Sequence, residues 1–338
     1  MTRHSLLALA LLLPTLSACS PEPGPETEAV TFEIPSGASF SQVTDTLAAH
    51  GLVRNPTLFR GVARLRGDDR NVRAGRYEVP ADIRWRPLLD RLVEGRVITV
   101  PLTIPEGFTL RQMVPRLAQI TELDVDEVEA MLLSQAQNGE WDVPGPGLEG
   151  YLFPDTYHFT PGVSLETVIA TMTARYRRLW TEERRARADE LGMSEREVMT
   201  LASIVQGEAR GTSEMSTISG VFHNRLRIGY PLQADPTVQY ALGERRSRLL
   251  YADIDAVADH PYNTYSIRGL PPGPIGAAGE AALDATLHPA DVEYLYFVAR
   301  PDGTHIFTRT LVEHNRARVE ARRLWNEVQQ RRDGGAGS

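Results

Sequence analysis

The chain has 338 residues, of which 42% are apolar and 24% charged, as in ordinary globular proteins. These values exclude wholesale disorder and a polytopic membrane protein. The formal net charge of −8 and the lack of a basic cluster exclude the electrostatic footprint of a nucleic-acid-binding protein. The length allows two or three compact units.

The first 19 residues have the pattern of a lipoprotein signal peptide. Arg3 and His4 form a short basic start, an apolar run follows, and residues 16–19 read Leu-Ser-Ala-Cys. This quartet predicts acylation of Cys19, export, and a lipid anchor in a membrane. The alternative is a chance cysteine after a plain secretory signal. Because Cys19 is the only cysteine, an intramolecular disulfide is excluded.

The pattern from residue 20 to 98 predicts a tether followed by a small α/β module. Residues 20–28 are rich in proline and acidic side chains, which favours an extended linker. The module at 29–98 should contain strands at 29–35 and 75–79, and helices beginning near Phe40, Phe59 and Trp85.

Residues 99–138 predict a second small module or an extension of the first. A strand is expected over 97–104 and a helix over 109–120. The glycine- and proline-rich stretch up to Gly150 then begins a larger mixed domain, expected over 139–331, with a long amphipathic pattern at 165–191 and late strands at 294–299 and 304–308. Residues 332–338 are expected to be a disordered tail. The fold class is therefore α+β.

One predicted helix places a carboxyl group at the edge of an apolar stripe. Ser194 to Glu197 form a capping box, and the helical pattern ends at Gly211. At about 100° per residue, Glu208 lies beside Leu201 and Ile204, where partial burial raises a carboxyl pKa toward that of a general acid.

Two further expectations concern the end of this helix. Gly207 lacks a side chain, which would let a ligand approach. The alternative role for Glu208 is to cap the helix or to pair with Arg210 or Arg225.

Five sequence blocks resemble one family in the right order. They are LEGYLFPDTY (148–157), ASIVQGEA (202–209), VFHNRLRIGYPLQADPTVQYALG (221–243), YNTYSIRGLPPGPI (262–275) and HPADVEYLYFVARPDGTHIFT (288–308). Together they are similar to the endolytic murein transglycosylases of the MltG (YceG-like) family, and the resemblance covers residues 29–325. The module at 29–98 resembles the LysM-like part of that family.

The resemblance implies a lytic transglycosylase. Such enzymes cleave the β-1,4 bond between N-acetylmuramic acid and N-acetylglucosamine and leave a 1,6-anhydro end. The family's catalytic glutamate falls on Glu208, whereas Gln206 and Gly207 stand where the family has glutamate and lysine. Ala234 and Ala278 are lesser departures from the family's pattern.

Eight polar or aromatic residues of these blocks are candidates for substrate binding. They are Glu149, Tyr151, Asn224, Gln233, Asp235, Asn263, Thr264 and Tyr265. Each has a plainer alternative: Asp235 can cap the helix that follows Pro236, Asn263 and Tyr265 can anchor loops, and the tyrosines can fill the core.

No cofactor and no metal are expected. The eight histidines show no close ligand spacing, and the glycines form no nucleotide-binding fingerprint. The expected partners are peptidoglycan strands and, through the family, wall-synthesis proteins such as penicillin-binding proteins. The expected location is the periplasmic side of the envelope, anchored to the inner membrane by family or by lipid on Cys19. A two-carboxylate glycosidase using Asp235 and a noncatalytic glycan-binding scaffold are the alternative functions.

If Cys19 carries the lipid, Cys19→Ala should move the protein from the detergent phase to the aqueous phase in detergent partition of cell membranes. Retention of the variant in the membrane fraction would argue against lipidation.

Overall fold

The computed structural model describes residues 28–133, 141–145, 147–244, 246 and 249–335. The predicted signal peptide, with Cys19, and most of the tether lie outside these residues. The chain divides into two compact units, the first ending at Ile98 and the second beginning at Thr99, and each has its own hydrophobic core. Helices and three two-stranded antiparallel sheets make up the described residues, which confirms the α+β class.

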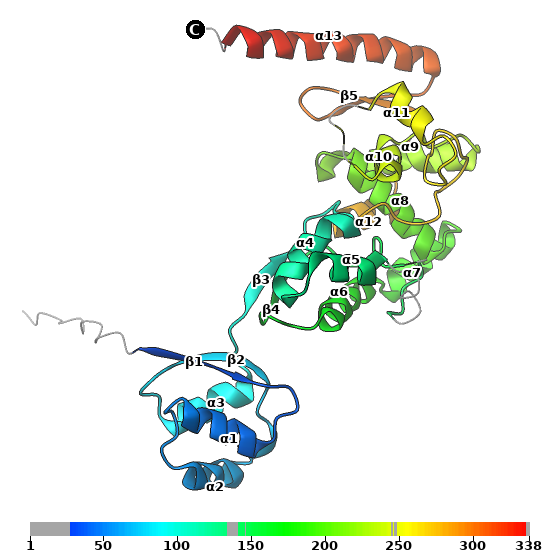
Figure 1. Cartoon of the computed structure of the whole chain (residues 1–338). Helices are drawn as coiled ribbons and strands as arrows, with labels where there is room; N and C mark the ends of the chain where they lie inside the picture. Colours follow the sequence, from blue (N-terminus) through cyan, green and yellow to red (C-terminus); the bar gives the residue numbers. More distant parts are fainter. Residues whose placement is uncertain (1–27, 134–140, 146, 245, 247–248, 336–338) are drawn as a thin grey trace, which may run out of the picture. The chain divides into compact units, whose positions relative to one another are not determined.

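In the first unit, three helices cover one face of a strand pair (Figure 1). Its elements are β1 (Ala29–Ile34), α1 (Phe40–Ala49), α2 (Pro56–Arg66), η1 (Asp68–Arg70), β2 (Gly75–Pro80) and α3 (Trp85–Glu94). β1 pairs with β2 antiparallel, with Phe32 opposite Tyr77. Both side chains are buried and stack at 5.6 Å between ring centroids. The alternation along each strand therefore directs one face onto the helices.

The second unit begins with β3 (Val100–Thr103), which is shorter than the strand predicted over 97–104. The reason is that the N–H of Ile98 donates to the carbonyl of Arg76 at 2.7 Å, so this end of the predicted strand is bound to the first unit. β3 pairs antiparallel with β4 (Thr156–Phe159). α4 (Leu110–Thr121) and α5 (Val125–Leu133) follow β3, and their apolar side chains share one core with residues far beyond 138, such as Met172 and Leu201.

Helices form most of the rest of the second unit. They are α6 (Leu165–Leu179), α7 (Glu182–Glu190), α8 (Glu195–Glu208), η3 (Thr212–Glu214), α9 (Met215–Arg227), α10 (Asp235–Leu242), α11 (Tyr251–Ala256), α12 (Glu280–Leu287) and α13 (Leu311–Gly335). The amphipathic pattern at 165–191 is split into α6 and α7 because Thr181 caps a new helix, its hydroxyl accepting the N–H of Arg184.

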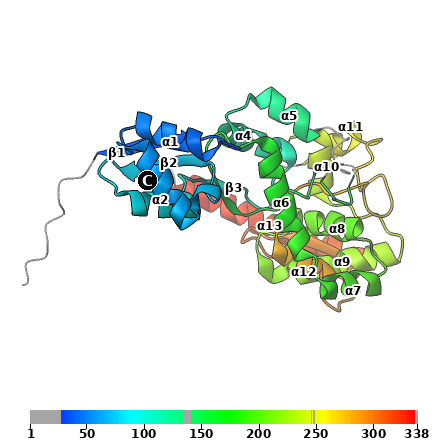
Figure 2. The ribbon, with the colours of Figure 1, turned by 90° about the horizontal axis from the view of Figure 1, so that it is seen from below.

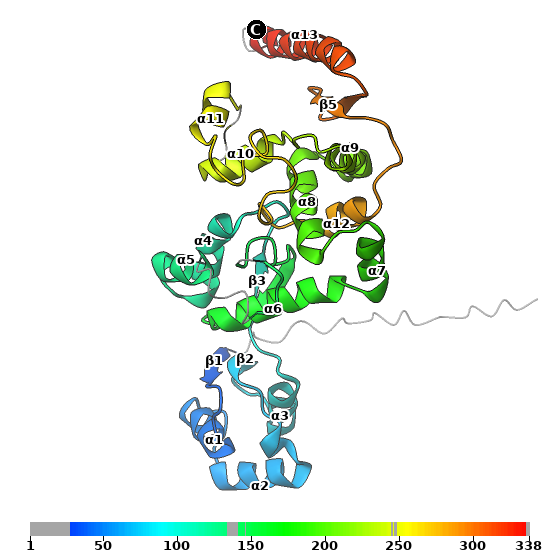
Figure 3. The ribbon, with the colours of Figure 1, turned by 90° about the vertical axis from the view of Figure 1, so that its right-hand side faces the viewer.

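α8 is the central helix of the second unit. It contacts α7, α9, α10 and α12, which surround it in Figure 2 and Figure 3. The predicted capping box is present, because Ser194 accepts the N–H of Glu197 and the Glu197 side chain accepts that of Ser194. All residues from Val198 to Val205 are buried, so this helix is enclosed on every side over two turns. The helix leaves the core only in its last turn, where Glu208 is partly exposed.

The C-terminal elements form a separate layer. β5 (Tyr296–Ala299) and β6 (His305–Thr308) make an antiparallel hairpin, and α13 packs on it. α13 extends into the segment that was expected to be a tail. Within the described ranges, no helix combines the length and apolar character needed to span a bilayer.

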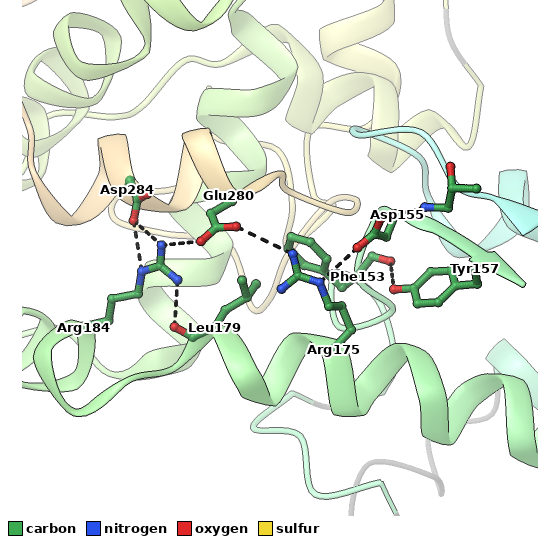
Figure 4. Close-up of polar contacts among 9 residues, drawn as sticks. Phe153, Asp155, Tyr157, Arg175, Leu179, Arg184, Glu280 and Asp284 are labelled. Atoms are coloured by element: carbon green, nitrogen blue, oxygen red, sulfur yellow. Dashed lines mark hydrogen bonds and ion pairs between the residues drawn. The ribbon is translucent and has the colours of Figure 1, made fainter.

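A network of ion pairs ties α6 and α7 to α12 (Figure 4). Arg175 lies 3.0 Å from Asp155 and 3.7 Å from Glu280. Arg184 lies 2.8 Å from both Glu280 and Asp284. Networks of this kind contribute more than isolated surface pairs. The network fixes the start of α12, directly after the loop that contacts the end of α8.

Candidate active site

The carboxyl group of Glu208 ends α8 and is half-buried. Burial raises its pKa to about 8, and the negative charge of Asp235 acts in the same direction. The positive charge of Arg225 and the main-chain N–H of Asp235 lower the pKa, but do not outweigh burial. The partial burial expected from the helical wheel is confirmed, and at neutral pH this carboxyl group holds a proton.

The alternative of an ion pair is wrong. No side chain of Arg210 or Arg225 comes within 4.0 Å of the Glu208 carboxylate in the described part of the chain. A contact pair would favour the ionised acid. Without one, Glu208 stays protonated.

Gly207 provides close packing, not an open approach for a ligand, so that expectation is corrected. A Cβ atom at this position would lie 2.8 Å from Cβ of Pro236, the second residue of α10. The missing side chain therefore lets the start of α10 reach the last turn of α8. This contact brings Asp235 next to Glu208.

Asp235 is exposed and does not cap α10, so the capping alternative is wrong. The helix begins at Asp235 itself, Ala234 holds the cap position, and no side chain makes a capping bond there. Instead, the Asp235 carboxylate accepts the hydroxyl of Tyr265 at 2.6 Å. Asp235 and the half-buried Tyr265 are the predicted residues that the structure brings together with Glu208.

The loop before α10 is held by Thr264. Its carbonyl accepts the N–H of Gln233 at 3.0 Å, and its hydroxyl accepts the N–H of Ala234 at 3.0 Å. Gln233 has a φ of 46°, in the left-handed region that non-glycine residues rarely adopt. These contacts hold the strained residue in place.

Three predicted substrate-binding residues have side chains occupied by the main chain. Thr264 and Asn263 are fully buried, and Asn224 is nearly so. The Asn263 amide donates to two carbonyls of α11 and its end, and the Asn224 amide donates to the carbonyls of Val292 and Tyr294. Direct contact with a sugar is incompatible with this burial, and the loop-anchor alternative fits Asn263.

Tyr151 is also buried completely, so its predicted contact with a sugar is not possible in this structure. Its ring packs edge-on against Tyr176, with centroids 5.2 Å apart. The core alternative is correct for this residue. Tyr262, which is half-buried, packs against Tyr240 with centroids 4.8 Å apart.

Glu149 is a second half-buried carboxyl group whose pKa is raised to about 8, mainly by burial. Its oxygens accept the N–H of Leu110 at 3.1 Å and the hydroxyl of Tyr240 at 3.3 Å. It therefore joins the start of α4 to α10. Both helices reach it from distant parts of the sequence, and nothing in the local pattern predicts Tyr240 as its partner.

Gln206 has a structural contact at the position where the family has a glutamate. Its side-chain oxygen accepts the N–H of Gly279 at 3.0 Å. The same loop exchanges main-chain bonds with Gly107 and Phe108 through Ala277. Gln206 thus binds the loop that leads into α12.

The described residues around Glu208 form no metal-binding cluster. Within the described residues, no group of three histidine, cysteine or acidic side chains is placed to hold a metal ion. A cavity of about 430 Å³ lies along the first half of α8, lined by Met193, Arg196, Thr200 and Pro271 among others, but Glu208 is not part of its wall. The site is therefore a partly exposed carboxyl group at a helix end.

The chain is similar to a known protein family and to characterised relatives. The model of the YceG-like family matches residues 32–320. An endolytic murein transglycosylase of Bacillus subtilis is 33% identical over 305 residues, covering 86% of this chain and 84% of that protein. An endolytic murein transglycosylase of Streptococcus pneumoniae is 29% identical, and the matched region covers 85% of this chain but only 57% of that longer protein.

A solved structure is also similar. The crystal structure of a yceG-like protein from Listeria monocytogenes is 34% identical, with a TM-score of 0.58, and the match covers 86% of this chain and 99% of that one. The region matched by the family model, residues 32–320, includes Glu208 and the loops around it.

The buried acid predicts a pH-dependent stability difference. The unfolded glutamate ionises near pH 4.5, whereas Glu208 in the folded protein ionises near pH 8. Stability conferred by the protonated form is complete below pH 4.5 and is lost as the pH rises to about 8. The wild-type protein should therefore lose stability relative to Glu208→Gln as the pH rises across this range. The free energies of unfolding of the two proteins, measured by urea denaturation at each pH, give this difference.

Glu182→Gln, at an exposed position of α7, is the matched control. A difference between Glu208→Gln and wild type that stays constant from pH 4.5 to pH 8 would contradict the assignment.

Gly207→Ala should reduce stability although alanine favours helices. The added Cβ forces Pro236 to move, which costs about 1–3 kcal/mol and outweighs a helix gain of about 1 kcal/mol. At Gly211, which has no heavy atom within 4 Å of an added Cβ, the change to alanine should stay within about 0.5 kcal/mol. Thermal unfolding compares the two variants, and equal stability would refute the packing argument.

Proposed function

Because the chain belongs to the YceG-like family, we propose that it is a peptidoglycan lytic transglycosylase in which Glu208 serves as both acid and base. The observation that carries this proposal is the half-buried, protonated carboxyl group at the end of α8. Glu208 lies within the matched region, and no other carboxyl group of α8 combines burial with an elevated pKa at this end of the helix.

In the first half-step, Glu208 donates its proton to the glycosidic oxygen. The bond from C1 of N-acetylmuramic acid to that oxygen breaks, and N-acetylglucosamine leaves with a free hydroxyl group. The positive charge that develops at C1 resembles an oxocarbenium ion, and the acetamido group of the substrate can stabilise it. Glu208 is now a carboxylate.

In the second half-step, the Glu208 carboxylate takes the proton from the 6-hydroxyl group of the same sugar. Oxygen 6 bonds to C1 and closes the 1,6-anhydro ring. The proton that was donated is recovered, and no water is consumed. One carboxyl group suffices because the substrate supplies its own nucleophile, whereas most glycosidases need two.

The pKa of about 8 fits both roles of Glu208. A general acid is most effective when its pKa lies near the working pH, since it must be protonated at the start and still release the proton readily. Burial keeps Glu208 protonated at the start of the reaction.

Asp235 is better suited to an electrostatic role than to that of a second catalytic carboxylate. It is exposed, its oxygen accepts the Tyr265 hydroxyl, and its charge raises the pKa of Glu208. A hydrolase would need Asp235 free to activate water. A noncatalytic glycan-binding scaffold would not explain the half-buried, protonated Glu208.

Four of the candidate substrate-binding residues keep exposed surface: Glu149, Gln233, Asp235 and Tyr265. We assign substrate contacts to all four because of this exposed surface, and three of them, Gln233, Asp235 and Tyr265, also flank the start of α10 beside Glu208. The strain at Gln233 is consistent with a functional position.

The remaining parts of the proposal concern placement in the cell. The relatives are named as murein transglycosylases, so we assign this chain to the cell envelope, anchored through Cys19. The unit that ends at Ile98 is assigned as a LysM-like module that contacts or positions glycan, and the enzyme as an endolytic one that terminates nascent strands beside penicillin-binding proteins.

Digestion of purified peptidoglycan by the full chain should release fragments with 1,6-anhydro ends, detected by mass spectrometry. Glu208→Gln should reduce the rate by at least about 100-fold, because a positioned acid and base typically contributes that much. Asp235→Asn should retain measurable activity with the same product.

Reducing ends instead of anhydro ends would establish a hydrolase. Loss of activity in Asp235→Asn equal to that in Glu208→Gln would favour the two-carboxylate mechanism. Unchanged release by Glu208→Gln would exclude Glu208 as the catalyst.

A further inference from the structure

Arg225 is a buried cation without a carboxylate in contact. It lies on α9 with 6% of its surface exposed. Its Nε donates to the carbonyl of Leu295 at 2.7 Å, and its Nη1 donates to the carbonyl of Leu232. In the described part of the chain, no carboxylate lies within 4.0 Å of this guanidinium. Burying a charge without an oppositely charged partner is unfavourable, which suggests that Arg225 has a specific role at this position.

Two aromatic rings hold the guanidinium in place. Its central carbon lies 5.5 Å from the ring centre of Tyr230 and 5.6 Å from that of Tyr296. The two rings pack nearly at right angles, 6.1 Å apart. Arginine suits such a site because its planar group can donate hydrogen bonds while its faces contact rings. The positive charge is therefore fixed in position.

The contacts of Arg225 lead to Glu208. Leu232, whose carbonyl Arg225 binds, begins the short loop that leads into α10, and Pro236 in the first turn of α10 packs against Gly207. α8 and α9 also pack directly on each other. Arg225 thus holds the start of a short loop, and the helix that follows this loop contacts Gly207, the residue before Glu208.

We infer that Arg225 is a positioning residue, whose fixed positive charge supports the Glu208 carboxylate that forms between the two half-steps. This inference rests on the proposed function. A half-buried carboxylate is unfavourable by itself, and a preorganised charge nearby stabilises it without rearrangement during the reaction. At contact distance the same charge would keep Glu208 ionised from the start, and the first proton transfer would fail.

The other charged and titratable groups around this pair act in defined directions. Asp235 faces Glu208 from α10 and opposes its ionisation. Tyr265, from the loop after α11, binds Asp235. Around Arg225, Tyr230 and Tyr296 contribute their rings, and His314 lies against Tyr296 from α13. Arg225 is therefore the charged side chain that opposes Asp235, and only the main-chain N–H of Asp235 acts in the same direction as Arg225.

The test is the pH dependence of peptidoglycan cleavage by the full chain in wild type, Arg225→Met and Arg225→Lys. Loss of the charge should move the alkaline limb of the rate profile upward by about one pH unit and lower the maximal rate about tenfold. Arg225→Lys keeps the charge and should restore the position of the limb. A purely structural role would scale the whole profile by the amount of folded protein without moving it.

Arg225→Gln provides a second neutral variant, because its amide N–H can keep one carbonyl contact, and thermal unfolding reports the fold of each. If neither neutral variant folds, Arg225→Lys decides, since an alkaline limb displaced by a full unit despite the retained charge overturns the inference. An unshifted limb in a folded neutral variant also overturns it. Inactivity of Glu208→Gln together with an unshifted limb would leave the proposed function standing and remove only the role of Arg225.

Discussion

The proposed chemistry depends on keeping one carboxyl group, that of Glu208, partly out of water. Glu208 is the last residue of a helix that is buried on every side for two turns, so its position follows from the packing of α8 and not from a flexible loop. The carboxyl group also lies at the negative end of the helix dipole, which disfavours its ionisation. Asp235 acts in the same direction, and Arg225, held beyond contact distance, acts against both. The balance of these charges keeps the proton bound but transferable.

The contrast with Glu149 shows that burial alone does not single out Glu208 as the proposed catalytic acid. Both carboxyl groups are half-buried and both have a pKa of about 8. The oxygens of Glu149, however, accept bonds from Leu110 and Tyr240, so this group joins two helices. Glu208, in contrast, has only the main-chain N–H of Asp235 as a partner within the described residues and no side-chain partner, which leaves its proton available to a ligand. Availability of the proton, together with an elevated pKa, distinguishes the two sites.

Local sequence patterns predicted the parts that depend on local physics. The capping box at Ser194 fixed the start of α8, and the helical period placed Glu208 at the edge of its apolar stripe, as the structure shows. The same reasoning could not show that the side chains of Asn224 and Thr264 form hydrogen bonds with distant main-chain atoms, since these partners lie in other loops. Gly207 was misjudged for the same reason, because the proline that fills the space beside it is 29 positions away. Asn224 and Thr264 were thus predicted to contact a ligand, whereas their side chains stabilise the fold.

The reach of Arg225 along the chain has a consequence for biosynthesis. Its acceptor at Leu295 lies 70 positions downstream, and Gln206 finds its partner in Gly279, 73 positions downstream. Contacts between such distant positions form late, because the intervening chain must be ordered first. An incomplete chain emerging from the ribosome, or one clipped before Leu295, therefore lacks the assembled centre. For an enzyme that cleaves the cell wall this order is protective, because an incomplete chain does not yet hold the arrangement proposed for cleavage.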